Sequence, residues 1–294
     1  DLLATEADLV PQTAGDPVIA AAGDVACSPG QAARVRVTGK LTRCSMRETS
    51  DLLLTTPLTA VLALGDLQYE SGKLRDFKRE YKKTWGRVLA ITHPTVGNHE
   101  FLTRGAAGYF AYFGRRAGSP GHGYYSYNIG AWHLISLNSN CVQVRGCDAG
   151  SRQGRWLAAD LRANRNRCTL AYWHHPRFSS GIHGDQPQTG PFWNALYAAG
   201  ADVVLVGHDH DYERFVPLTP AGRPDRKRGI RQFVVGTGGK NRDRFKKVRS
   251  GSVRRSAKSF GVLMLTLHKT SYEWRFVATA DSNFTDTGKG TCHS

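Results

Sequence analysis

The sequence predicts an α/β fold in which β-strands are covered by helices. Short apolar runs that resemble buried strands alternate along the chain with longer segments of helical periodicity. The runs are almost continuously apolar, which is typical of strands covered on both faces. The chain has 294 residues, of which 40% are hydrophobic, so it can form a large packed core and is not largely disordered. We expect one domain over residues 1–294, with residues 1–16 as an extended lead-in segment.

Four apolar runs each end in polar residues. They are 18–22 before Gly23-Asp24, 60–64 before Gly65-Asp66, 170–173 before His174-His175-Pro176, and 202–206 before Gly207-His208-Asp209-His210. Helical crossovers are expected at 73–88, 153–164 and 191–199, and their alternation with the runs predicts a sheet. Two hairpins, 124–128 with 132–137 and 260–267 with 272–278, indicate a second sheet.

The polar residues at the strand ends predict a metal site. Open α/β sheets place their ligand sites at the carboxyl ends of strands, so these side chains should converge. The segment Gly97-Asn98-His99-Glu100 follows another short apolar stretch and adds an amide and an imidazole. Carboxylate, imidazole and amide donors suit iron, manganese and zinc. There are more donors than one ion can use, which favours two metals.

Five segments resemble, in order and spacing, the motif blocks of the calcineurin-like metallophosphoesterases. They are Gly23-Asp24, Gly65-Asp66-Leu67-Gln68-Tyr69, Gly97-Asn98-His99-Glu100, Trp173-His174-His175-Pro176 and Gly207-His208-Asp209-His210-Asp211-Tyr212-Glu213-Arg214. Tyr69 and the Tyr-Glu-Arg after the last histidine resemble the purple acid phosphatase branch in particular. The resemblance implies a four-layer αββα sandwich, with two mixed β-sheets flanked by helices.

The resemblance also implies which residues hold the metals. A ferric ion would be held by Asp24, bridging Asp66, Tyr69 and His210, and a second ion, Zn, Fe(II) or Mn, by Asp66, Asn98, His174 and His208. Many members of the superfamily carry a histidine two residues after the first aspartate, but this chain has Ala26 there. Tyr69 can fill that vacancy, and its phenolate predicts iron with a tyrosinate charge-transfer colour.

His99 and His183 are the catalytic residues that the resemblance implies. A metal-bound hydroxide would attack phosphorus, while these two imidazoles stabilise charge and donate a proton to the leaving group. Glu100 and Asp66 are candidates to orient His99. We expect His174, two residues before Pro176, to be the ligand, and His175 to pack beside it.

Two further features near the motifs are given no definite chemical role. Asp209 stands between two ligand histidines, so we expect it to face away from the metals and assign it no chemistry. The turn Gly236-Thr237-Gly238-Gly239 resembles a late Gly-rich turn beside the metals in the family, but the residues fit an ordinary tight turn equally well.

Three functions remain open at this stage. The leading hypothesis is a secreted phosphatase that hydrolyses phosphate monoesters, and the alternative is a phosphodiesterase acting on phospholipid headgroups or nucleotides. A basic polyanion-binding protein is the third, because residues 222–258 hold 14 Lys and Arg against Asp225 and Asp243. This basic stretch would attract a polyanion or an anionic surface, and we infer no obligate protein partner. No apolar run approaches the roughly 20 residues that span a bilayer.

The cysteines favour an oxidising compartment. The six cysteines form no CxxC pair, and the simplest of fifteen pairings is Cys27–Cys44, Cys141–Cys147 and Cys168–Cys292. Three disulfides indicate a secreted protein. The sequence begins at Asp1 without a basic and apolar signal segment, which we interpret as a processed mature chain.

Overall fold

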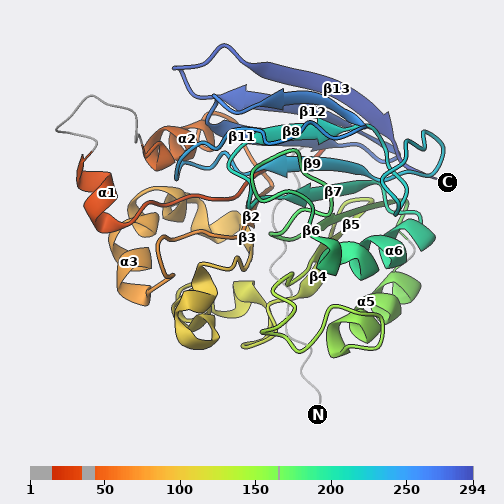
Figure 1. Ribbon diagram of the computed structural model, residues 1–294, viewed down its shortest axis with the longest axis horizontal. Coiled ribbons are helices and arrows are strands. Elements are labelled where there is room, and N and C mark those ends of the chain that lie inside the picture. The colour runs from red at the N-terminus through yellow and green to blue at the C-terminus, as the bar shows by residue number, and fades with distance from the viewer. Residues whose placement is uncertain (1–14, 35–43, 165, 294) are drawn as a thin grey trace.

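Figure 1 shows the computed structural model, which describes residues 15–34, 44–164 and 166–293. The expected lead-in segment, 1–16, therefore lies almost wholly outside the described residues. The strands are β1 Val18–Ala22, β2 Ala60–Leu64, β3 Thr92–Thr95, β4 Tyr125–Ile129, β5 Trp132–Ser136, β6 Cys168–Tyr172, β7 Val203–Val206, β8 Tyr212–Phe215, β9 Arg231–Val235, β10 Ser252–Ser256, β11 Gly261–Leu267, β12 Ser271–Ala278 and β13 Thr285–Thr291. The α-helices are α1 Pro29–Arg34, α2 Met46–Leu52, α3 Leu74–Arg79, α4 Ala107–Phe113, α5 Arg152–Ala163 and α6 Gly190–Ala198.

The strands form two mixed sheets. One has the order β13-β12-β11-β1-β2-β3, and the other has the order β10-β8-β9-β7-β6-β5-β4. In the first sheet β1, β2 and β3 run parallel, and in the second β5, β6, β7 and β9 do. Each sheet therefore presents the carboxyl ends of several parallel strands along one edge, and this edge carries the motif residues.

Side-chain alternation places one core between the sheets and another under α5 and α6. In β7, Val203 and Leu205 belong to the core that includes β1, β2 and β11, whereas Val204 and Val206 pack with Trp193 of α6. Helix α2 and the 3₁₀ segment Trp85–Ile91 pack on the six-stranded sheet. Figure 1 shows α5 and α6 together on the side of the seven-stranded sheet. The four-layer αββα arrangement expected from the resemblance is confirmed.

The expectation that the four apolar runs share one sheet is wrong. Strands β1 and β2 belong to the six-stranded sheet, and β6 and β7 belong to the seven-stranded sheet. The two hairpins also separate, because β4 and β5 join the second sheet while β11 and β12 join the first. Strand pairing between segments more than a hundred residues apart decides this division, and an apolar run carries no mark of its partner.

The helix expected over 73–88 is broken into α3 and the 3₁₀ segments Tyr81–Lys83 and Trp85–Ile91. The backbone N–H of Tyr81 donates to Gln68 Oε1 at 3.2 Å, where a continuous helix would use a carbonyl of its own. The hydroxyl of Thr84 donates back to the Glu80 and Tyr81 carbonyls, a local bond that competes with the helical pattern. The other two helices begin and end within one residue of expectation.

All three disulfides pair as expected. They join Cys27 to Cys44, Cys141 to Cys147, and Cys168 to Cys292. The last one ties the start of β6 to the chain after β13 across a sequence separation of 124 residues. Among the described residues, the helices are all too short or too polar to cross a membrane.

Candidate metal centre

The facing edges of the two sheets bring the motif residues together. Asp24, Asp66 and Asn98 follow β1, β2 and β3 of the first sheet. His174 follows β6 of the second sheet, and His208 and His210 follow β7. Asp24, Asp66 and His174 are buried, with at most 1% of their surfaces exposed. The centre thus lies between the sheets at the carboxyl ends of their parallel strands.

Four donor atoms form a first group around the phenol of Tyr69. Its oxygen lies 2.9 Å from Asp24 Oδ1, 3.2 Å from Asp66 Oδ2 and 3.0 Å from His210 Nε2. His210 Nε2 is 3.2 Å from Asp24 Oδ1. These are the four residues that the resemblance assigns to the ferric site.

A second group surrounds the imidazole of His174. Its Nε2 atom lies 3.3 Å from Asp66 Oδ2, 3.1 Å from Asn98 Oδ1 and 3.3 Å from His208 Nδ1. These are the residues that the resemblance assigns to the divalent site. Asp66 Oδ2 belongs to both groups, so one carboxylate oxygen stands where two neighbouring cations would share it.

The donor spacing fits metal coordination. Two donors that each lie about 2.1 Å from a common cation, at an angle near 90°, are about 3.0 Å apart. The separations of 2.9 to 3.3 Å within the two groups match this value. Carboxylate, phenol, imidazole and amide donors together suit iron, zinc or manganese. The residues of both groups could therefore hold one ion each.

Hydrogen bonds outside the centre orient two of the imidazoles. His174 Nδ1 is 2.9 Å from the Leu64 carbonyl oxygen, and His210 Nδ1 is 2.8 Å from Asn241 Oδ1. The N–H that donates in each case is at Nδ1, so the Nε2 lone pair is directed to the centre. Asn241 was not anticipated from the sequence, because it lies in the basic stretch outside every motif block.

The backbone at three candidate ligands is left-handed. Asp24, Asp66 and His208 have φ angles of 60°, 50° and 74°, a region that residues other than glycine rarely occupy. Each follows a glycine, and a side chain at Gly207 would approach Asp24 Oδ2 within 2.7 Å. A side chain at Gly97 would approach Asp66 Oδ1 within 2.1 Å. Such strain is characteristic of functional sites.

The electrostatics of the centre favour a bound cation. Burial alone would raise the pKa of Asp66, but His174 and His99 hold it well below its ordinary value. Burial lowers the pKa of His174, which Asp66 more than offsets, raising it to about 10. Burial and the charges of Asp24 and Asp66 raise the pKa of Tyr69 well above 10. Without a cation, protons on His174 and His210, whose pKa values Asp66 and Asp24 raise, balance the carboxylates, and Tyr69 stays a phenol.

Glu100 differs from expectation. Its carboxylate does not bind the His99 ring but accepts four backbone N–H groups, those of Asp66, Leu67, Gln68 and Gly97, at 2.8 to 3.2 Å. It therefore fixes the loop after β2 against the loop after β3. This role has no sequence signal beyond a glutamate within a motif block.

His99 and His183 lie beside different residues of the centre. His99 Nδ1 is 2.6 Å from the Glu70 carbonyl oxygen, and its Nε2 is 3.9 Å from Asp66 Oδ2. The ring of His183, an exposed residue, lies 4.4 Å from the ring of His208 between centroids. The His183 backbone N–H donates to Asp209 Oδ1 at 2.9 Å. Asp209 also accepts from the Ser179 hydroxyl, so it braces the loop that carries His183.

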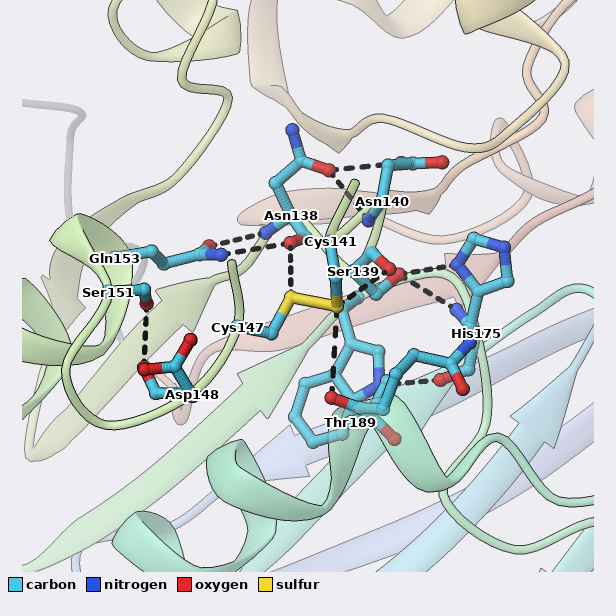
Figure 2. The surroundings of a disulfide bond; sticks show 12 residues. Asn138, Ser139, Asn140, Cys141, Cys147, Asp148, Ser151, Gln153, His175 and Thr189 are labelled. Carbon is cyan, nitrogen blue, oxygen red and sulfur yellow. Dashed lines mark hydrogen bonds between the residues drawn. A yellow bond between two sulfur atoms is a disulfide. The ribbon is translucent and has the colours of Figure 1, made fainter. Parts of the chain in front are cut away.

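His175 is held by the loop that precedes the Cys141–Cys147 disulfide. Figure 2 shows its Nδ1 atom beside the hydroxyl of Ser139, at 2.7 Å, and its backbone N–H donates to the same oxygen at 3.0 Å. A ring nitrogen of His175 also lies within 4.8 Å of ring nitrogens of His174 and His208, while Nδ1 makes the bond to Ser139. Burial and the charge of His174 lower the pKa of His175 to about 3.

The Gly-rich turn lies against the centre. Gly238 N–H donates to the Gly23 carbonyl at 2.8 Å, and a side chain at Gly236 would approach Asp24 Oδ2 within 2.9 Å. This contact favours the reading of a turn beside the metals. The next residue, Lys240, places its ammonium 4.4 Å from the centroid of the Tyr69 ring and pairs with Glu70.

Comparisons with known proteins agree with this geometry. The family model for calcineurin-like phosphoesterases matches residues 18–212, a range that contains all seven candidate ligands. Purple acid phosphatase 21 of Arabidopsis thaliana is 31% identical over 235 residues, which cover 71% of this chain and 51% of that protein. Acid phosphatase type 7 of Homo sapiens is 28% identical over 187 residues, covering 54% and 41%. The chain spans about half the length of these relatives or less.

Solved structures share the fold. Purple acid phosphatase PPD1 from yellow lupin (Lupinus luteus) seeds has a TM-score of 0.78 at 16% identity, covering 97% of this chain and 55% of that one. PhoD has a TM-score of 0.66 at 13% identity, covering 96% and 71%. The family match over 18–212 decides the relationship. The chain belongs to the calcineurin-like phosphoesterase family, and within it resembles the purple acid phosphatases.

Proposed function

We propose that this protein is a dinuclear-metal phosphoesterase that hydrolyses phosphate monoesters. The observation that carries the proposal is the position of Asp66 Oδ2, which is 3.2 Å from Tyr69 Oη in one donor group and 3.3 Å from His174 Nε2 in the other. Asp24, Asp66, Tyr69 and His210 would hold Fe(III), and Asp66, Asn98, His174 and His208 would hold Zn, Fe(II) or Mn. When bound, the two cations neutralise the phosphate and lower the pKa of a coordinated water.

The chain's own groups orient the ester and move the proton. With its Nδ1–H donated to the Glu70 carbonyl, His99 directs Nε2 to the side of Asp66. His183 stands beside the His208 ring, where Asp209 holds its backbone. When the ring nitrogen that faces the ester carries a proton, either imidazole would stabilise negative charge on the phosphoryl oxygens and protonate the departing alkoxide. We assign His99 and His183 to these roles.

Exposed cations beside the centre, which we call the basic rim, are consistent with an anionic substrate. Asp243 N–H donates to the His210 carbonyl at 3.0 Å, and Lys246 N–H donates to the Ser180 carbonyl at 2.8 Å. The segment 243–247 thus crosses from a candidate ligand residue to the loop that carries His183. Arg244, Lys246 and Lys247 are exposed on it. Their field would raise the local concentration of phosphate esters.

The three disulfides support secretion, because such bonds persist in oxidising compartments. Treatment with iodoacetamide under denaturing but non-reducing conditions should leave all six cysteines unmodified. Alkylation of cysteines in freshly isolated protein would contradict an exported protein. Mass spectrometry of the peptides measures this directly.

The test of the function is metal analysis of the purified protein with a visible spectrum and parallel assays. We expect two metal ions per chain, one of them iron, a visible absorption band, and faster hydrolysis of p-nitrophenyl phosphate than of bis-p-nitrophenyl phosphate. Faster diester hydrolysis would assign the same centre to a phosphodiesterase. Failure to bind metal or to hydrolyse either ester after reconstitution with iron and zinc would reject the enzyme and favour a polyanion-binding protein.

Replacing the shared carboxylate tests the bridge. Asp66→Asn should lose most of the bound metal and lower kcat by about a thousandfold or more, because an amide oxygen carries no charge to share between two cations. Asp51→Asn, on exposed Asp51 of α2, is the control and should keep both ions. Retention of two metal ions by Asp66→Asn would show that Asp66 is not the bridge.

A further inference from the structure

A cavity, which we call the basic cavity, lies at the end of the sheets opposite the metal centre. Its volume is about 710 Å³, within the range of small-molecule sites. Among the described residues that line it are Arg167, Asp202, Arg226, Lys227, Arg231 and Lys289. Arg167 stands before β6, Asp202 stands before β7, and Arg231 begins β9.

The cavity is separate from the metal centre. The candidate ligands follow the carboxyl ends of β6 and β7, whereas the cavity lies at the amino ends of the same strands. A five-residue strand such as β9 spans roughly 15 Å. A ligand in the cavity would therefore not touch the metals.

Five cations meet in this cavity from four separate segments. They are Arg167, Arg226, Lys227, Arg231 and Lys289. No Asp or Glu within the described part of the chain pairs with any of them in an ion pair of 4.0 Å or less. Such a convergence of unpaired positive charge is costly unless an anion or solvent compensates it.

The acid among the described lining residues does not balance these charges. Asp202 is only 3% exposed, and its carboxylate is already occupied. Its Oδ2 accepts the Thr169 N–H at 2.8 Å, and its Oδ1 accepts the His293 N–H at 2.6 Å and lies 3.1 Å from His293 Nδ1. Asp202 therefore holds the walls together and does not neutralise the five cations.

Hydrogen bonds and a disulfide hold the walls of the cavity in place. The Arg231 guanidinium donates to Tyr272 Oη at 3.2 Å and to the Phe215 carbonyl at 3.3 Å, and it lies 4.8 Å from the centroid of the Trp274 ring. Asp225 Oδ1 accepts the N–H of Lys227 at 3.0 Å, which fixes the turn that carries Arg226 and Lys227. The Cys168–Cys292 disulfide joins the walls on the other side. A guanidinium held in place loses little freedom when it binds an anion.

The lining also limits the class of ligand. Two described lining residues carry aromatic rings: Tyr272 is only 3% exposed, and the His293 ring is held through Nδ1 against Asp202 Oδ1 and the Gly200 carbonyl, both at 3.1 Å, so the cavity offers a base little free ring face for stacking. Arginine and lysine bind phosphate groups strongly. We propose that this cavity is a second, non-catalytic binding site for a compact phosphorylated polyanion, such as a chain of condensed phosphates.

Calorimetric titration of the full chain with tripolyphosphate tests the proposal. The test variant is the double charge reversal Arg226→Glu with Lys227→Glu, both exposed residues. The matched control is Arg244→Glu with Lys247→Glu, which changes the net charge equally at the metal end. We expect the test variant to weaken binding by at least about tenfold, because it removes two cations that would donate charged hydrogen bonds to phosphate and replaces them with anions that repel it. The control should change the Kd at this site by less than about twofold.

A single reversal on another segment tests whether the cavity acts as one site. Lys289→Glu, on the exposed part of β13, should weaken the same binding event by at least about fivefold. Equal losses in the test and control variants would mean that only net charge matters, and would overturn the site. Unchanged binding in both Lys289→Glu and the Arg226→Glu, Lys227→Glu variant would also overturn the site.

Two further ligands distinguish the source of the phosphate. If long-chain polyphosphate binds more tightly per phosphate group than tripolyphosphate does, the natural ligand is a polymer. If the two bind equally per phosphate group, it is a free oligophosphate. Both results uphold the site. Tighter binding of a DNA oligonucleotide than of either would overturn the assignment to compact phosphate. Hydrolysis of p-nitrophenyl phosphate should be unchanged in Arg226→Glu with Lys227→Glu. Failure of the binding-site proposal can therefore be distinguished from failure of the enzyme proposal.

Discussion

Tyr69 is the residue that would make this centre a coloured iron site. Its oxygen lies within 3.2 Å of Asp24, Asp66 and His210, while burial and the two carboxylates raise its pKa well above 10. Only a strongly charged cation would ionise a phenol in these surroundings. The tyrosine position thus connects the choice of metal to a property that can be measured without any substrate.

Replacement of Tyr69 by phenylalanine should remove the visible absorption of the iron form, because no phenolate remains to transfer charge to the metal. We expect the protein to retain the second metal, whose donor group does not include Tyr69. The matched control is Tyr81→Phe, since Tyr81 is also fully buried but lies outside both donor groups. An unchanged spectrum in Tyr69→Phe would remove the case for tyrosinate ligation.

Glu100 shows how one carboxylate can organise two loops. Both of its oxygens accept backbone N–H groups, four in all, from the loops after β2 and β3. In Glu100→Gln, the side-chain NH₂ must face N–H donors, which leaves buried groups unpaired. We expect a loss of about 1–3 kcal/mol in the free energy of unfolding and weaker metal binding. Urea titration and metal affinity measure the two effects.

The control for this change is Glu273→Gln, at an exposed position of β12, which should alter neither quantity. Weaker metal binding distinguishes the loop function from a purely structural one, since Asp66 and Asn98 lie on the loops that Glu100 joins. Wild-type stability and metal affinity in Glu100→Gln would refute this role.

At the scale of elements, the strand ends were predictable and their partners were not. The apolar runs before Asp24 and Asp66 end where β1 and β2 end, because glycine and a polar residue mark the boundary in the sequence itself. The division into two sheets depends on pairings such as β1 with β11, more than two hundred residues apart. The helix beyond residue 73 breaks because Gln68, outside it, takes the N–H of Tyr81. Local periodicity reveals neither the partner of a strand nor a hydrogen bond from outside that ends a helix.

Between the edge strands of the two sheets, His93 of β3 stacks on Tyr127 of β4 at 4.0 Å between ring centroids. Burial, together with the charge of Arg116, lowers the pKa of His93 to about 4. The unfolded chain has an ordinary histidine pKa near 6.5, so as the pH falls it takes up a proton before the folded protein does. Stability that is present above about pH 6.5 is therefore lost between about pH 6.5 and pH 4.

The variant His93→Phe should remove this acid sensitivity while keeping a ring against Tyr127. Between pH 7 and pH 4.5, the wild type should lose about 2 kcal/mol more of its free energy of unfolding than the variant. His122→Phe, at a partly exposed position, is the control and should keep the wild-type pH profile. Parallel profiles for His93→Phe and the wild type would contradict the assignment. Urea unfolding at the two pH values provides the comparison.

At the scale of the whole molecule, the two sheets explain why seven separated residues meet. Each sheet contributes the carboxyl ends of parallel strands, and neither sheet alone contains both donor groups: Asp66 comes from the first, and His174 and His210 come from the second. The motif spacing indicated the set, whereas Asn241, which orients His210, was missed because it lies outside the motifs. A side chain that acts through a neighbour has no distinctive spacing.

The basic stretch 222–258 is divided between the two ends of the molecule. Arg226, Lys227 and Arg231 line the basic cavity, while Arg244 and Lys247 lie on the segment that begins beside His210. At 0.1 M salt the Debye length is about 10 Å, less than the roughly 15 Å of one strand. Charges at one end therefore have little effect at the other under ordinary conditions, and the two halves of the stretch can be separated by experiment.

Arg244→Glu with Lys247→Glu should lower kcat/KM for p-nitrophenyl phosphate several-fold at low salt, because two cations that attract the dianion become repulsive. The effect should appear in KM and not in kcat, and it should fade as sodium chloride approaches about 1 M, where the Debye length is about 3 Å. Arg226→Glu with Lys227→Glu carries the same change of net charge at the far end and should leave kcat/KM within about twofold of wild type at 0.1 M salt. An equal loss in both pairs would show that the substrate responds to overall charge, and a loss confined to kcat would place Arg244 or Lys247 in the chemistry instead of in the approach of the substrate.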